Sequence, residues 1–400
     1  MNLPVLYQGS VKEVRGPLRL EGARGPVDCV VFDYTDAYSV FDWGRMPDLL
    51  PGKGAALAII AADWFERLEK PETWKDFSRS ADALALRRGN RFGAPFNELG
   101  EALQRDGLRT HYLGVFSGTG CAPVSAQTAP FSRIAVRGVS VVKPRMGQIL
   151  GRGVADYNAT RAAPIPRLIP LEVVFRFSCP GGSSLLERVG RDPSYLTELG
   201  YGDLRAEAGS KWEFPVLELF TKLESTDRPL TLAEALAISG LSAETVQEML
   251  FRTAWVAGWL KSVCGRSGLE LADGKLEWAL NERCELLLVD AIGPDELRIL
   301  KDGVQLSKEF LRAQYRAAPW YAAVLAAKRE ASLRGSAEWK KGVAEGPSPL
   351  APEIRELGSQ LYQSLANELT GRRWYPSAWD LGRVTAEIER ATKATVGERA

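Results

Sequence analysis

The sequence predicts an α+β protein with two packed lobes, and three observations support this prediction. The chain has 400 residues, which is more than one compact hydrophobic core usually holds. Short apolar runs bounded by turn residues fill the N-terminal part and return at 168–176, as expected for β-strands. Other segments place apolar residues three or four positions apart, which is the spacing of helices that cover a core.

The N-terminal part is expected to contain short strands followed by one helix. Turn-rich RGPLRLEGARGP separates the strand-like runs VLYQGSVKEVR and DCVVFDYTD. Residues 54–69 carry apolar side chains at helical spacing and stop before Pro71, so a helix is expected there. Residues 72–105 are polar without clean periodicity, and we interpret them as an insertion.

The middle of the chain alternates between strand-like and turn-rich segments. The run VSVVKPRM at 139–146 predicts a strand. Residues 147–167 are rich in Gly, Pro and Arg, and they predict a long loop of the kind that often carries function. The β-prone run LIPLEVVFR at 168–176 predicts a further strand.

The second half is expected to be mainly helical around one pair of strands. Thr231 and Glu234 form the pattern of a capping box, which predicts the start of a helix. A second helix is expected over 242–264. The runs GLELADGKLEWAL and CELLLVDAIG read as two strands joined at residues 281–283. Among the later segments, 353–370 shows the clearest helical spacing.

Charge and cysteine content exclude several classes of protein. Lys and Arg number 51 against 50 Asp and Glu, so the basic excess of a nucleic-acid-binding protein is missing. The five cysteines form no Cys-x-x-Cys pair, which argues against a disulfide framework or a zinc site and favours a reducing cytoplasm. No signal-peptide pattern and no run of about 18 apolar residues occurs, so we expect no membrane association.

The sequence contains a single histidine, His111, in the strand-like run GLRTHYLGV. A catalytic triad, a multi-histidine metal site or a histidine base would all require this one residue. We interpret His111 as structural. The chemistry is therefore expected to rely on carboxylates, Lys, Arg and a hard cation.

A set of carboxylates is expected to meet on the paired strands. Asp273, Lys275 and Glu277 alternate with other residues, and the period of two in a strand places them on one face. Asp290 ends the next strand and Asp295 follows in the turn. Converging carboxylates suit Mg²⁺, which keeps other positions for water and phosphate oxygens. The alternative is a solvated strand face with alternating salt bridges.

Two glycine-containing turns are candidates for binding phosphate. Gly9 and Lys12 lie between strand-like runs, where backbone N–H groups and an ammonium can cover phosphates, although a plain hairpin turn fits as well. Lys53 stands between Gly52 and Gly54 before a helix, whose N-terminus attracts anions. This second turn lacks the Ser or Thr of a Walker A loop.

Three arginines are candidate forks for phosphate or carboxylate groups. Arg176 ends the strand-like run LEVVFR, and a Gly-Gly-Ser-Ser turn follows at 181–184. Arg298 comes three residues after Asp295, and Arg312 lies in the next expected helix. Each arginine taken alone is also compatible with an ordinary surface position.

Taken in order, these pieces resemble the SAICAR synthetase family, the phosphoribosylaminoimidazole-succinocarboxamide synthases. LYQGSVKEV is similar to the family's Leu-Tyr-x-Gly-Lys-x-Lys start, and DAYSVFDWGRMPDLLPGKG to its Asp-x-x-Ser-x-x-Asp segment with Lys-Gly. IPLEVVFR with GGSS resembles Pro-x-Glu-x-x-x-Arg…Gly-Ser. LADGKLEWA and LLVDAIGPDELR resemble Asp-x-Lys-x-Glu-Phe-Gly and Asp-Glu-x-x-Pro-Asp-x-x-Arg. The five matches are collinear over roughly residues 5–320.

The resemblance implies a reaction and its cofactors. The family uses ATP and Mg²⁺ to join L-aspartate to a carboxyaminoimidazole ribonucleotide, giving SAICAR, ADP and phosphate. It also implies a β-rich N-terminal lobe that holds the nucleotide against a larger mixed lobe, with the site in the cleft between them. Phosphoryl transfer depends on positioning and charge neutralisation more than on a proton shuttle, which suits a chain with one histidine.

The resemblance also implies roles for particular residues. Gly9 and Lys12 would cover the ATP phosphates, while Lys143 and Glu172 would lie near the adenine. Glu277 and Asp290 would hold the metal. Arg176, Ser183 and Arg298 would bind the ribonucleotide phosphate, with Arg312 nearby. Asp273, Lys275 and Lys222 would line the reacting centre.

The remaining implied contacts concern the substrates. Ser39 and Asp42 would lie in a loop that faces them, and Asp295 would belong to the same pocket. L-aspartate carries two carboxylates, so its pocket should present cationic or N–H donors. Lys53 and Lys222 are the candidates for this role.

Some positions depart from the family pattern. Ser10 replaces the first lysine of the opening motif, Ala291 replaces the acid after Asp290, and Trp278 with Ala279 replaces Phe-Gly. Two rival functions therefore stay open. One is a ligase of the same fold that acts on another heterocyclic carboxylate, and the other is a non-catalytic nucleotide-binding relative.

The expected organisation has three parts and small-molecule partners. Residues 1–168 would form the nucleotide-binding lobe, including the insertion at 72–105. Residues 169–330 would form the lobe that binds substrate and metal, and 331–400 a helical extension. The expected partners are the imidazole ribonucleotide and L-aspartate, with neither nucleic acid nor membrane, and a homodimer stays open.

Overall fold

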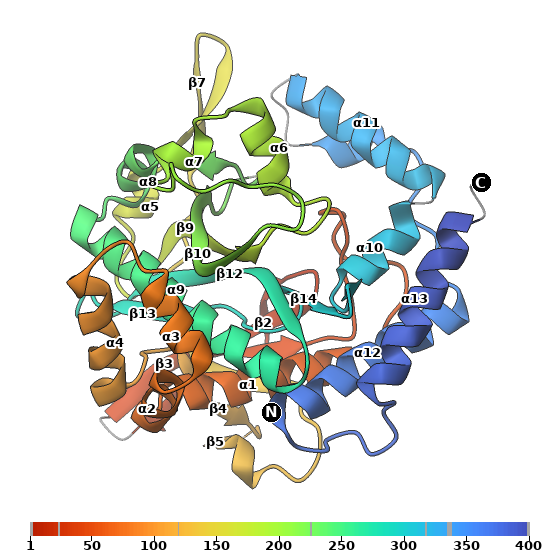
Figure 1. The fold of residues 1–400 in the computed structure, drawn as a ribbon, viewed down its shortest axis with the longest axis horizontal. Coiled ribbons are helices and arrows are strands. Elements are labelled where there is room, and N and C mark those ends of the chain that lie inside the picture. Colours follow the sequence, from red (N-terminus) through yellow and green to blue (C-terminus); the bar gives the residue numbers. More distant parts are fainter. Residues whose placement is uncertain are drawn as a thin grey trace.

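The protein is built around two large antiparallel sheets with helices at their periphery (Figure 1). The structure is a computed structural model that describes residues 3–22, 25–118, 120–224, 226–316, 318–333 and 338–397. The predicted α+β class is confirmed. Within these ranges, no helix combines the length and hydrophobicity that crossing a bilayer requires.

The N-terminal sheet forms because hairpins join short β-prone runs. Val31 and Ala135 contribute to a small core on one of its faces, and a long helix covers the other. The strands follow the order β1 (Val5–Gln8), β2 (Lys12–Gly22), β3 (Gly25–Tyr34), β6 (Arg133–Arg137), β4 (Tyr112–Phe116) and β5 (Cys121–Ala122).

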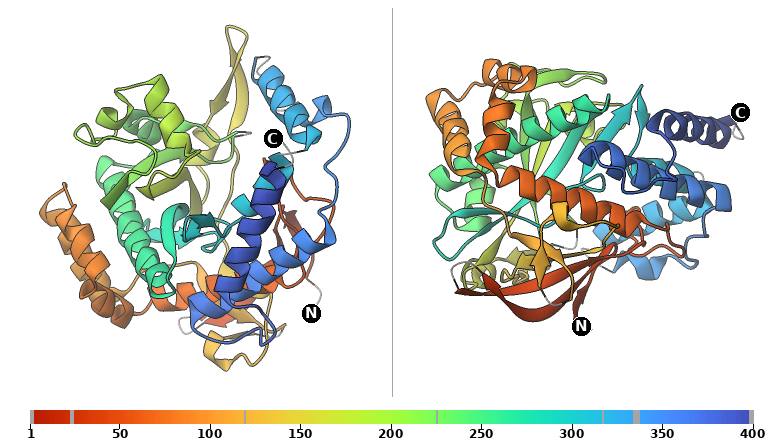
Figure 2. Two further views of the ribbon diagram at one scale, coloured as in Figure 1. Left: turned by 45° about the vertical axis from the view of Figure 1, so that its right-hand side comes forward. Right: turned by 90° about the horizontal axis from the view of Figure 1, so that it is seen from below.

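That long helix is α1 (Lys53–Leu68), and the C-terminal helix α12 (Pro352–Thr370) packs against it (Figure 2). Both helices lie within one residue of the positions that the sequence predicts. Gly52 precedes α1 with φ of 84°, a left-handed conformation that glycine adopts without strain. The first turn is closed by Asp36 Oδ1, which accepts a hydrogen bond from the Gly54 N–H at 3.0 Å.

The second sheet carries the predicted pair of strands at its centre. Helix α9 (Ala243–Arg266) contacts β9, β10 and β12 and begins where Ser242 caps the N–H of Thr245. The predicted capping box of Thr231 is present at α8 (Leu232–Ser239). The strand order is β11 (Pro229–Leu230), β10 (Lys211–Thr221), β9 (Arg167–Ser178), β12 (Glu270–Leu280), β14 (Leu297–Lys301) and β15 (Val304–Gln305), and β13 (Leu286–Val289) also pairs with β12.

The segment 72–105 is mostly helical, although its sequence shows no clean periodicity. Its helices are short, and each buries only two or three apolar side chains, such as Trp74 and Phe77 in the first. Such a pattern is too brief to be recognised as helical, so the helices become visible only from their packing against each other and α9. They are α2 (Pro71–Ser78), α3 (Ala81–Arg88) and α4 (Ala94–Asp106).

The strand predicted at 139–146 and the loop predicted at 147–167 are both wrong. In the first segment Ser140 forms a single bridge to Arg167, and a strand begins only at Arg145, near the end of the segment. In the second, a hairpin projects from the body of the protein (Figures 1 and 2). Both faces of the hairpin are exposed, so its sequence lacks the alternation that marks a half-buried strand. The elements are β7 (Arg145–Ile149), β8 (Arg152–Asp156) and α5 (Asn158–Arg161).

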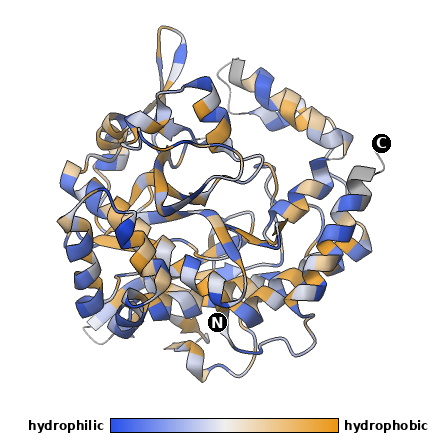
Figure 3. Ribbon diagram, in the orientation of Figure 1, coloured by the Kyte–Doolittle hydropathy of each residue, from blue (hydrophilic) through white to orange (hydrophobic). Residues whose placement is uncertain are grey.

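The main hydrophobic core is continuous and includes Leu57, Leu276 and Leu365, one from each expected part of the chain. The division at residues 168 and 330 therefore stays a prediction. In Figure 3 the helices carry both hydrophobic and hydrophilic residues, as expected where one side covers a core. The remaining helices are α6 (Ser184–Arg191), α7 (Tyr195–Glu198), α10 (Glu309–Arg316), α11 (Pro319–Leu333) and α13 (Leu381–Gly397), with 3₁₀ turns at Val124–Ala126 and Trp339–Gly342.

The packing of α4 on α9 leads to a prediction about stability. A Cβ atom on Gly100 would lie 2.2 Å from the Trp255 ring, which is itself stacked on Phe96 with 5.0 Å between ring centroids. Gly100→Ala is therefore expected to lower the free energy of unfolding by about 1–3 kcal/mol, because a well-packed core resists added volume. Chemical denaturation measures this change.

The matched control is Gly190→Ala in α6. A Cβ atom there would meet nothing within 4 Å, so this substitution should be neutral or slightly stabilising. Equal effects of the two substitutions would show that the contact with Trp255 does not limit stability.

Candidate functional site

Three charged side chains follow one another along β12 with the predicted period of two. The strand register places Asp273 opposite Arg176 of β9, and Glu277 opposite Glu172. Side chains directly opposite each other lie on the same face, with Cβ atoms about 4.5–5.5 Å apart. The first pair has opposite charges, whereas the two glutamates repel each other unless cations separate them. Lys275 lies between these two positions on β12.

Two lysines separate the opposed glutamates. Lys222 Nζ, just after β10, lies 2.6 Å from Glu277 Oε1 and 3.3 Å from Glu172 Oε2. Lys275 Nζ lies 2.7 Å from Glu172 Oε2. Burial alone would raise the pKa of Glu172, but the two ammonium groups hold it below its ordinary value. Glu172 therefore stays ionised beneath the two lysines.

A third carboxylate and a third lysine extend this arrangement. Asp290 follows β13 with φ of 66°, and its carboxylate forms an ion pair with the ammonium of Lys12 at the start of β2. The same ammonium lies 4.4 Å from the ring centroid of Phe32. We call the resulting set of three lysines and three carboxylates the charge cluster. Its members are Lys12, Glu172, Lys222, Lys275, Glu277 and Asp290.

The two carboxylates assigned to the metal influence each other's protonation. Burial and the negative charge of Asp290 raise the pKa of Glu277 to about 7, although Lys222 and Lys275 oppose the shift. Burial would also raise the pKa of Asp290, but Lys12 and Lys222 hold it below its ordinary value. Asp290 therefore carries the charge more readily than Glu277 does.

These two carboxylates fit a magnesium ion in the chemistry of their donor atoms. Both present hard oxygen ligands, and a divalent cation would offset the burial and the repulsion by Asp290 that together raise the pKa of Glu277. Among the described residues, no group of three or more His, Cys, Asp or Glu side chains forms a ready metal cage. An ion here would take its other ligands from water and phosphate.

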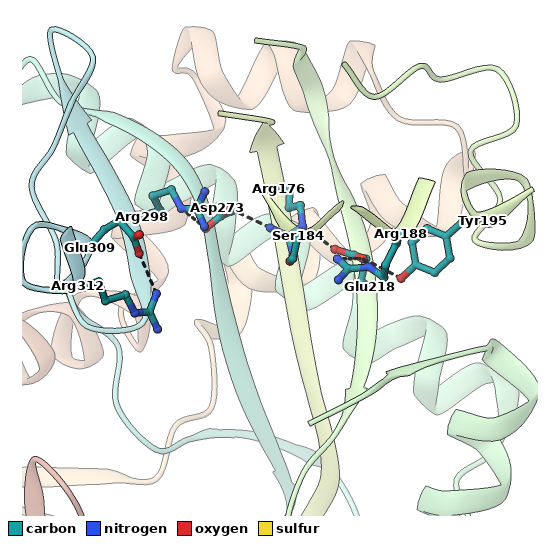
Figure 4. Close-up of polar contacts among 9 residues, drawn as sticks. All are labelled: Arg176, Ser184, Arg188, Tyr195, Glu218, Asp273, Arg298, Glu309 and Arg312. Atoms are coloured by element: carbon teal, nitrogen blue, oxygen red, sulfur yellow. Dashed lines mark hydrogen bonds and ion pairs between the residues drawn. The ribbon is translucent and has the colours of Figure 1, made fainter. Parts of the chain in front are cut away.

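A row of arginines and carboxylates, which we call the arginine row, continues across the same sheet (Figure 4). Its members are Arg298, Asp273, Arg176, Glu218 and Arg188. Arg176 lies near its centre, where NH1 donates to Asp273 Oδ2 at 2.9 Å and NH2 donates to Ser184 Oγ at 3.4 Å. Arg298 Nε lies 3.5 Å from Asp273 Oδ1. Arg298 thus has most of its N–H donors free of this contact, whereas Arg176 is buried and more fully engaged.

The other end of this row converges on Glu218 of β10. Its Oε2 accepts from Arg176 Nε at 2.5 Å, and its Oε1 accepts from Arg188 NH2 at 2.5 Å and from the Tyr195 hydroxyl at 2.8 Å. Glu218 is fully buried, so burial would raise its pKa, but the two guanidinium groups hold the pKa below its ordinary value. The carboxylate therefore fixes the orientation of both arginines.

The Gly-Ser turn lies beside this row, at the N-terminus of α6. Ser183 is 1 % exposed, and its hydroxyl has no hydrogen-bond partner among the described residues. A Cβ atom on Gly181 or Gly182 would meet nothing within 4 Å, so one side of the turn is open. An unsatisfied hydroxyl at a helix N-terminus suits an anion such as phosphate.

Lys53 lies away from the charge cluster, in a buried ion pair. Its Nζ is 2.8 Å from Asp295 Oδ2, and the Lys53 side chain is fully buried. The hydroxyl of Tyr362 donates to the other oxygen of Asp295 at 2.5 Å. The ammonium group therefore points into the protein, toward Asp295.

Comparison with known proteins shows the family. The family model described as SAICAR synthetase matches residues 126–326. A putative phosphoribosylaminoimidazole-succinocarboxamide synthase of Archaeoglobus fulgidus is 34% identical over 345 residues, covering 86% of this chain and 88% of the relative. The chain belongs to the SAICAR synthetase family. A synthase of Thermoplasma volcanium is 24% identical over 356 residues and covers 87% of this chain and 95% of that protein.

The fold agrees with this assignment. A SAICAR synthase structure from Saccharomyces cerevisiae, described as complexed with SAICAR, superposes with a TM-score of 0.56 at 18% sequence identity. The match covers 93% of this chain and 96% of that one. Family, α+β fold and ligase class are thus confirmed as the sequence predicts.

Several residues implied by the SAICAR synthetase resemblance lie outside the two groups described above. Lys143 is exposed and contacts no described residue through a hydrogen bond or ion pair. Asp42 pairs instead with Lys328 of α11 at 2.6 Å, and Ser39 is half-buried in the same loop. Arg312 pairs with Glu309 at 2.9 Å, near Arg298 (Figure 4). Their roles stay predictions.

The glycine turn at the start of this SAICAR synthetase-family chain has the tight geometry expected of it. The Gly9 N–H donates to Lys12 O at 2.9 Å. A Cβ atom on Gly9 would lie 2.8 Å from the same oxygen, so a larger residue would open the turn. The turn thereby fixes the position from which Lys12 reaches Asp290.

Sequence reasoning missed Glu218, Arg188 and Tyr195. Glu218 stands alone among apolar residues in VLELF, and a lone acid in a buried strand usually has a charged partner. This pattern could have singled out Glu218. Arg188 and Tyr195 lie in short helices without distinctive spacing, and only the three-dimensional structure places them beside that carboxylate.

The surroundings of His111 agree with its interpretation from the sequence as a structural residue. Its ring packs edge-on against Phe32 and Phe65, with centroid distances of 5.4 and 5.3 Å. Burial lowers the pKa of His111 to about 3. The imidazole is therefore neutral in the folded protein at physiological pH.

This shift predicts how stability responds to acid. An unfolded histidine takes up a proton near pH 6.5, whereas folded His111 resists protonation down to about pH 3. Its contribution is fully present above pH 6.5 and is lost progressively as the pH falls toward 3. In His111→Leu, the free energy of unfolding should fall less steeply than in the wild type over this range. Denaturant titrations at several pH values test this, and equal slopes would contradict the assignment.

Proposed function

We propose that this chain joins L-aspartate to the carboxylate of 5-amino-4-carboxyimidazole ribonucleotide, with ATP converted to ADP and phosphate. The product is SAICAR. The observation that carries the proposal is the continuity of the charge cluster and the arginine row along β12, where Asp273 precedes Glu277 by two alternations of the strand. One end can neutralise the nucleotide phosphates and the other can bind the phosphate of the ribonucleotide.

The nucleotide end of the site contains Lys12, Glu277 and Asp290. Lys12 would exchange its contact with Asp290 for a phosphate oxygen, while the Gly9 turn covers the phosphates from above. Glu277 and Asp290 would hold Mg²⁺, which supplies charge neutralisation on the phosphates. The adenine would lie toward Lys143 and the strand that carries Glu172, as the family resemblance implies.

The ribonucleotide end contains Arg298, Arg176 and Ser183. Arg298 has the more available guanidinium and supplies the main charge-assisted hydrogen bonds to phosphate. Arg176 is held by Glu218 and Asp273, so it meets the ligand in a fixed orientation. Ser183 adds its unsatisfied hydroxyl and the N-terminus of α6. Arg312 lies close enough to this end to assist.

The reaction requires two bond exchanges between these ends. A carboxylate oxygen of the ribonucleotide attacks the γ-phosphorus of ATP, and the bond to the ADP oxygen breaks. The resulting acyl phosphate is then attacked by the aspartate amine, and phosphate leaves as the amide forms and the nitrogen loses a proton. Lys275 and Lys222 are placed to stabilise negative charge on the transferred group. Asp273 holds Arg176 and Arg298 beside each other at the ribonucleotide end.

The L-aspartate pocket is expected beside Lys222. Of the two lysines predicted to bind the aspartate carboxylates, Lys53 is fully buried against Asp295, whereas the side chain of Lys222 is 25% exposed. Ser39 and Asp42 complete the expected substrate loop. We further infer small-molecule partners only, a cytoplasmic location and, as an open alternative, a homodimer.

The first test is a coupled assay of ADP release from the whole chain. Release should require the ribonucleotide, L-aspartate and Mg²⁺ together. L-aspartate should exceed L-asparagine and L-alanine by at least about 10²-fold in kcat/KM, because a poorer ligand leaves buried polar groups unpaired. Comparable rates with L-asparagine would mean that the amine substrate is different. Absence of ribonucleotide-dependent ADP release would overturn the proposed function.

A pair of substitutions separates the two ends of the site. Arg298→Ala should raise the KM for the ribonucleotide about 10- to 100-fold and change that for ATP far less, because a charge-assisted phosphate contact is lost. Asp290→Asn should instead abolish turnover that depends on Mg²⁺ and ATP. Steady-state kinetics with each substrate varied in turn give both results.

Arg88→Ala provides the matched control for the loss of a guanidinium. Arg88 lies in α3 and pairs with Glu213 at the surface, so its removal should leave both KM values unchanged. An equal rise of both KM values in Arg298→Ala would assign Arg298 to the nucleotide instead.

A further inference from the structure

Asp295 is a buried carboxylate held by donors from two distant parts of the chain. Lys53 Nζ lies 2.8 Å from one carboxylate oxygen, and the Tyr362 hydroxyl donates to the other at 2.5 Å. All three side chains are buried. An ion pair this deep is stable only when its remaining hydrogen-bonding positions are also satisfied. Tyr362 satisfies one of them.

Lys53 depends on the same tyrosine. Its ammonium lies 4.9 Å from the centroid of the Tyr362 ring, on which a cation is attracted by the π-electrons. Lys53 is also the first residue of α1, where the positive end of the helix dipole disfavours a cation. The carboxylate of Asp295 and the face of Tyr362 together offset this unfavourable position.

Asp295 lies in the segment of chain that joins the two ends of the proposed site. In sequence it separates Asp290 of the charge cluster from Arg298 of the arginine row. The segment is tied to β12, because the Lys275 N–H donates to Glu296 O at 3.1 Å. Whatever fixes the side chain of Asp295 therefore fixes the segment that sets the distance between metal ligand and phosphate-binding arginine.

Helix α12 and the residues after it also hold the turn that precedes α1. Gln363 Nε2 donates to Pro51 O at 3.0 Å, and the Tyr375 hydroxyl donates to Gly52 O at 3.2 Å. The family model ends at residue 326, so these contacts come from a part of the chain outside the matched region. The C-terminal extension thus contacts the turn before α1 at two points and reaches Asp295 through the hydroxyl of Tyr362.

We propose that Tyr362 is a positioning residue of the active site, which holds Asp295 and thereby the segment from Asp290 to Arg298. The inference rests on the proposed function and assigns a role to the C-terminal extension. Tyr362 touches no substrate. It acts by keeping Asp295 in the one orientation that places metal ligand and arginine in register.

The test is Tyr362→Phe in the full chain, which removes only the hydroxyl and keeps the ring beside Lys53. The kcat/KM for the ribonucleotide should fall about 10- to 100-fold, because a hydrogen bond to a charged group is lost. The KM for ATP should change far less. Assays are run at a temperature at which circular dichroism shows every variant to be folded.

Tyr112→Phe is the matched control. Tyr112 is a buried tyrosine of β4 whose hydroxyl donates at 3.0 Å to Glu66 Oε1, a carboxylate that belongs neither to the charge cluster nor to the arginine row. The Tyr112→Phe variant loses the same type of hydrogen bond, so its stability and activity show the effect of a purely structural loss. Its Tm should fall by a similar amount to that of Tyr362→Phe, while its kcat/KM values stay at the wild-type level.

A double variant tests whether Tyr362 acts through Asp295. Asp295→Asn removes the charge that Tyr362 orients, so adding Tyr362→Phe should cause no further loss of kcat/KM. Additive losses, or a Tyr362→Phe enzyme as active as Tyr112→Phe, would overturn the inference. A wild-type chain without ribonucleotide-dependent ADP release would instead overturn the proposed function, so the two failures are distinguishable.

Discussion

Charge compensation on the face shared by β9 and β12 is the constraint on which this site depends. Glu172 and Glu277 lie directly opposite each other and are buried, so neither could be accommodated without a cation between them. Lys275 supplies one cation from β12, and Lys222 supplies the other from the residue after β10. The same lysines then become available to phosphate oxygens when a nucleotide arrives. Compensation within the protein and recognition of the ligand therefore use the same groups.

Charge compensation also governs the arginine row, but there it fixes the position of the cation. Arg176 is surrounded by Glu218 and Asp273, so its position is determined before any ligand binds. Such preorganisation lowers the entropic cost of ordering the side chain during binding. Arg298 keeps a more open guanidinium beside it. Arg176 thus provides orientation, and Arg298 provides most of the hydrogen bonds that can be exchanged for contacts with a ligand.

The sequence was sufficient where a local pattern determines the structure. The period of two predicted that Asp273, Lys275 and Glu277 share a face, and Thr231 with Glu234 predicted a helix start, because both depend on neighbours a few residues away. It was insufficient for the helices at 72–105, whose stability comes from packing on α9 rather than from periodicity.

The same limit applies to the partners of the candidate residues. The inward orientation of Lys53 depends on Asp295 and Tyr362, which lie more than two hundred residues away along the chain. No local pattern around Lys53 contains this information. From the sequence, the N-terminus of α1 is a candidate anion site. In the structure, Lys53 is instead paired with Asp295 inside the protein.

The packing of α12 on α1 joins two segments that are synthesised at very different times. The hydrogen bond between Gln363 and Pro51 spans 312 residues, and Tyr362 beside it covers the ammonium of Lys53. A ribosome makes the chain from the N-terminus, so α1 is complete long before its covering helix emerges. Until then the outer side of α1 lacks its apolar cover, and Asp295 lacks one donor. If Tyr362 positions Asp295 as proposed, catalytic competence follows the emergence of α12.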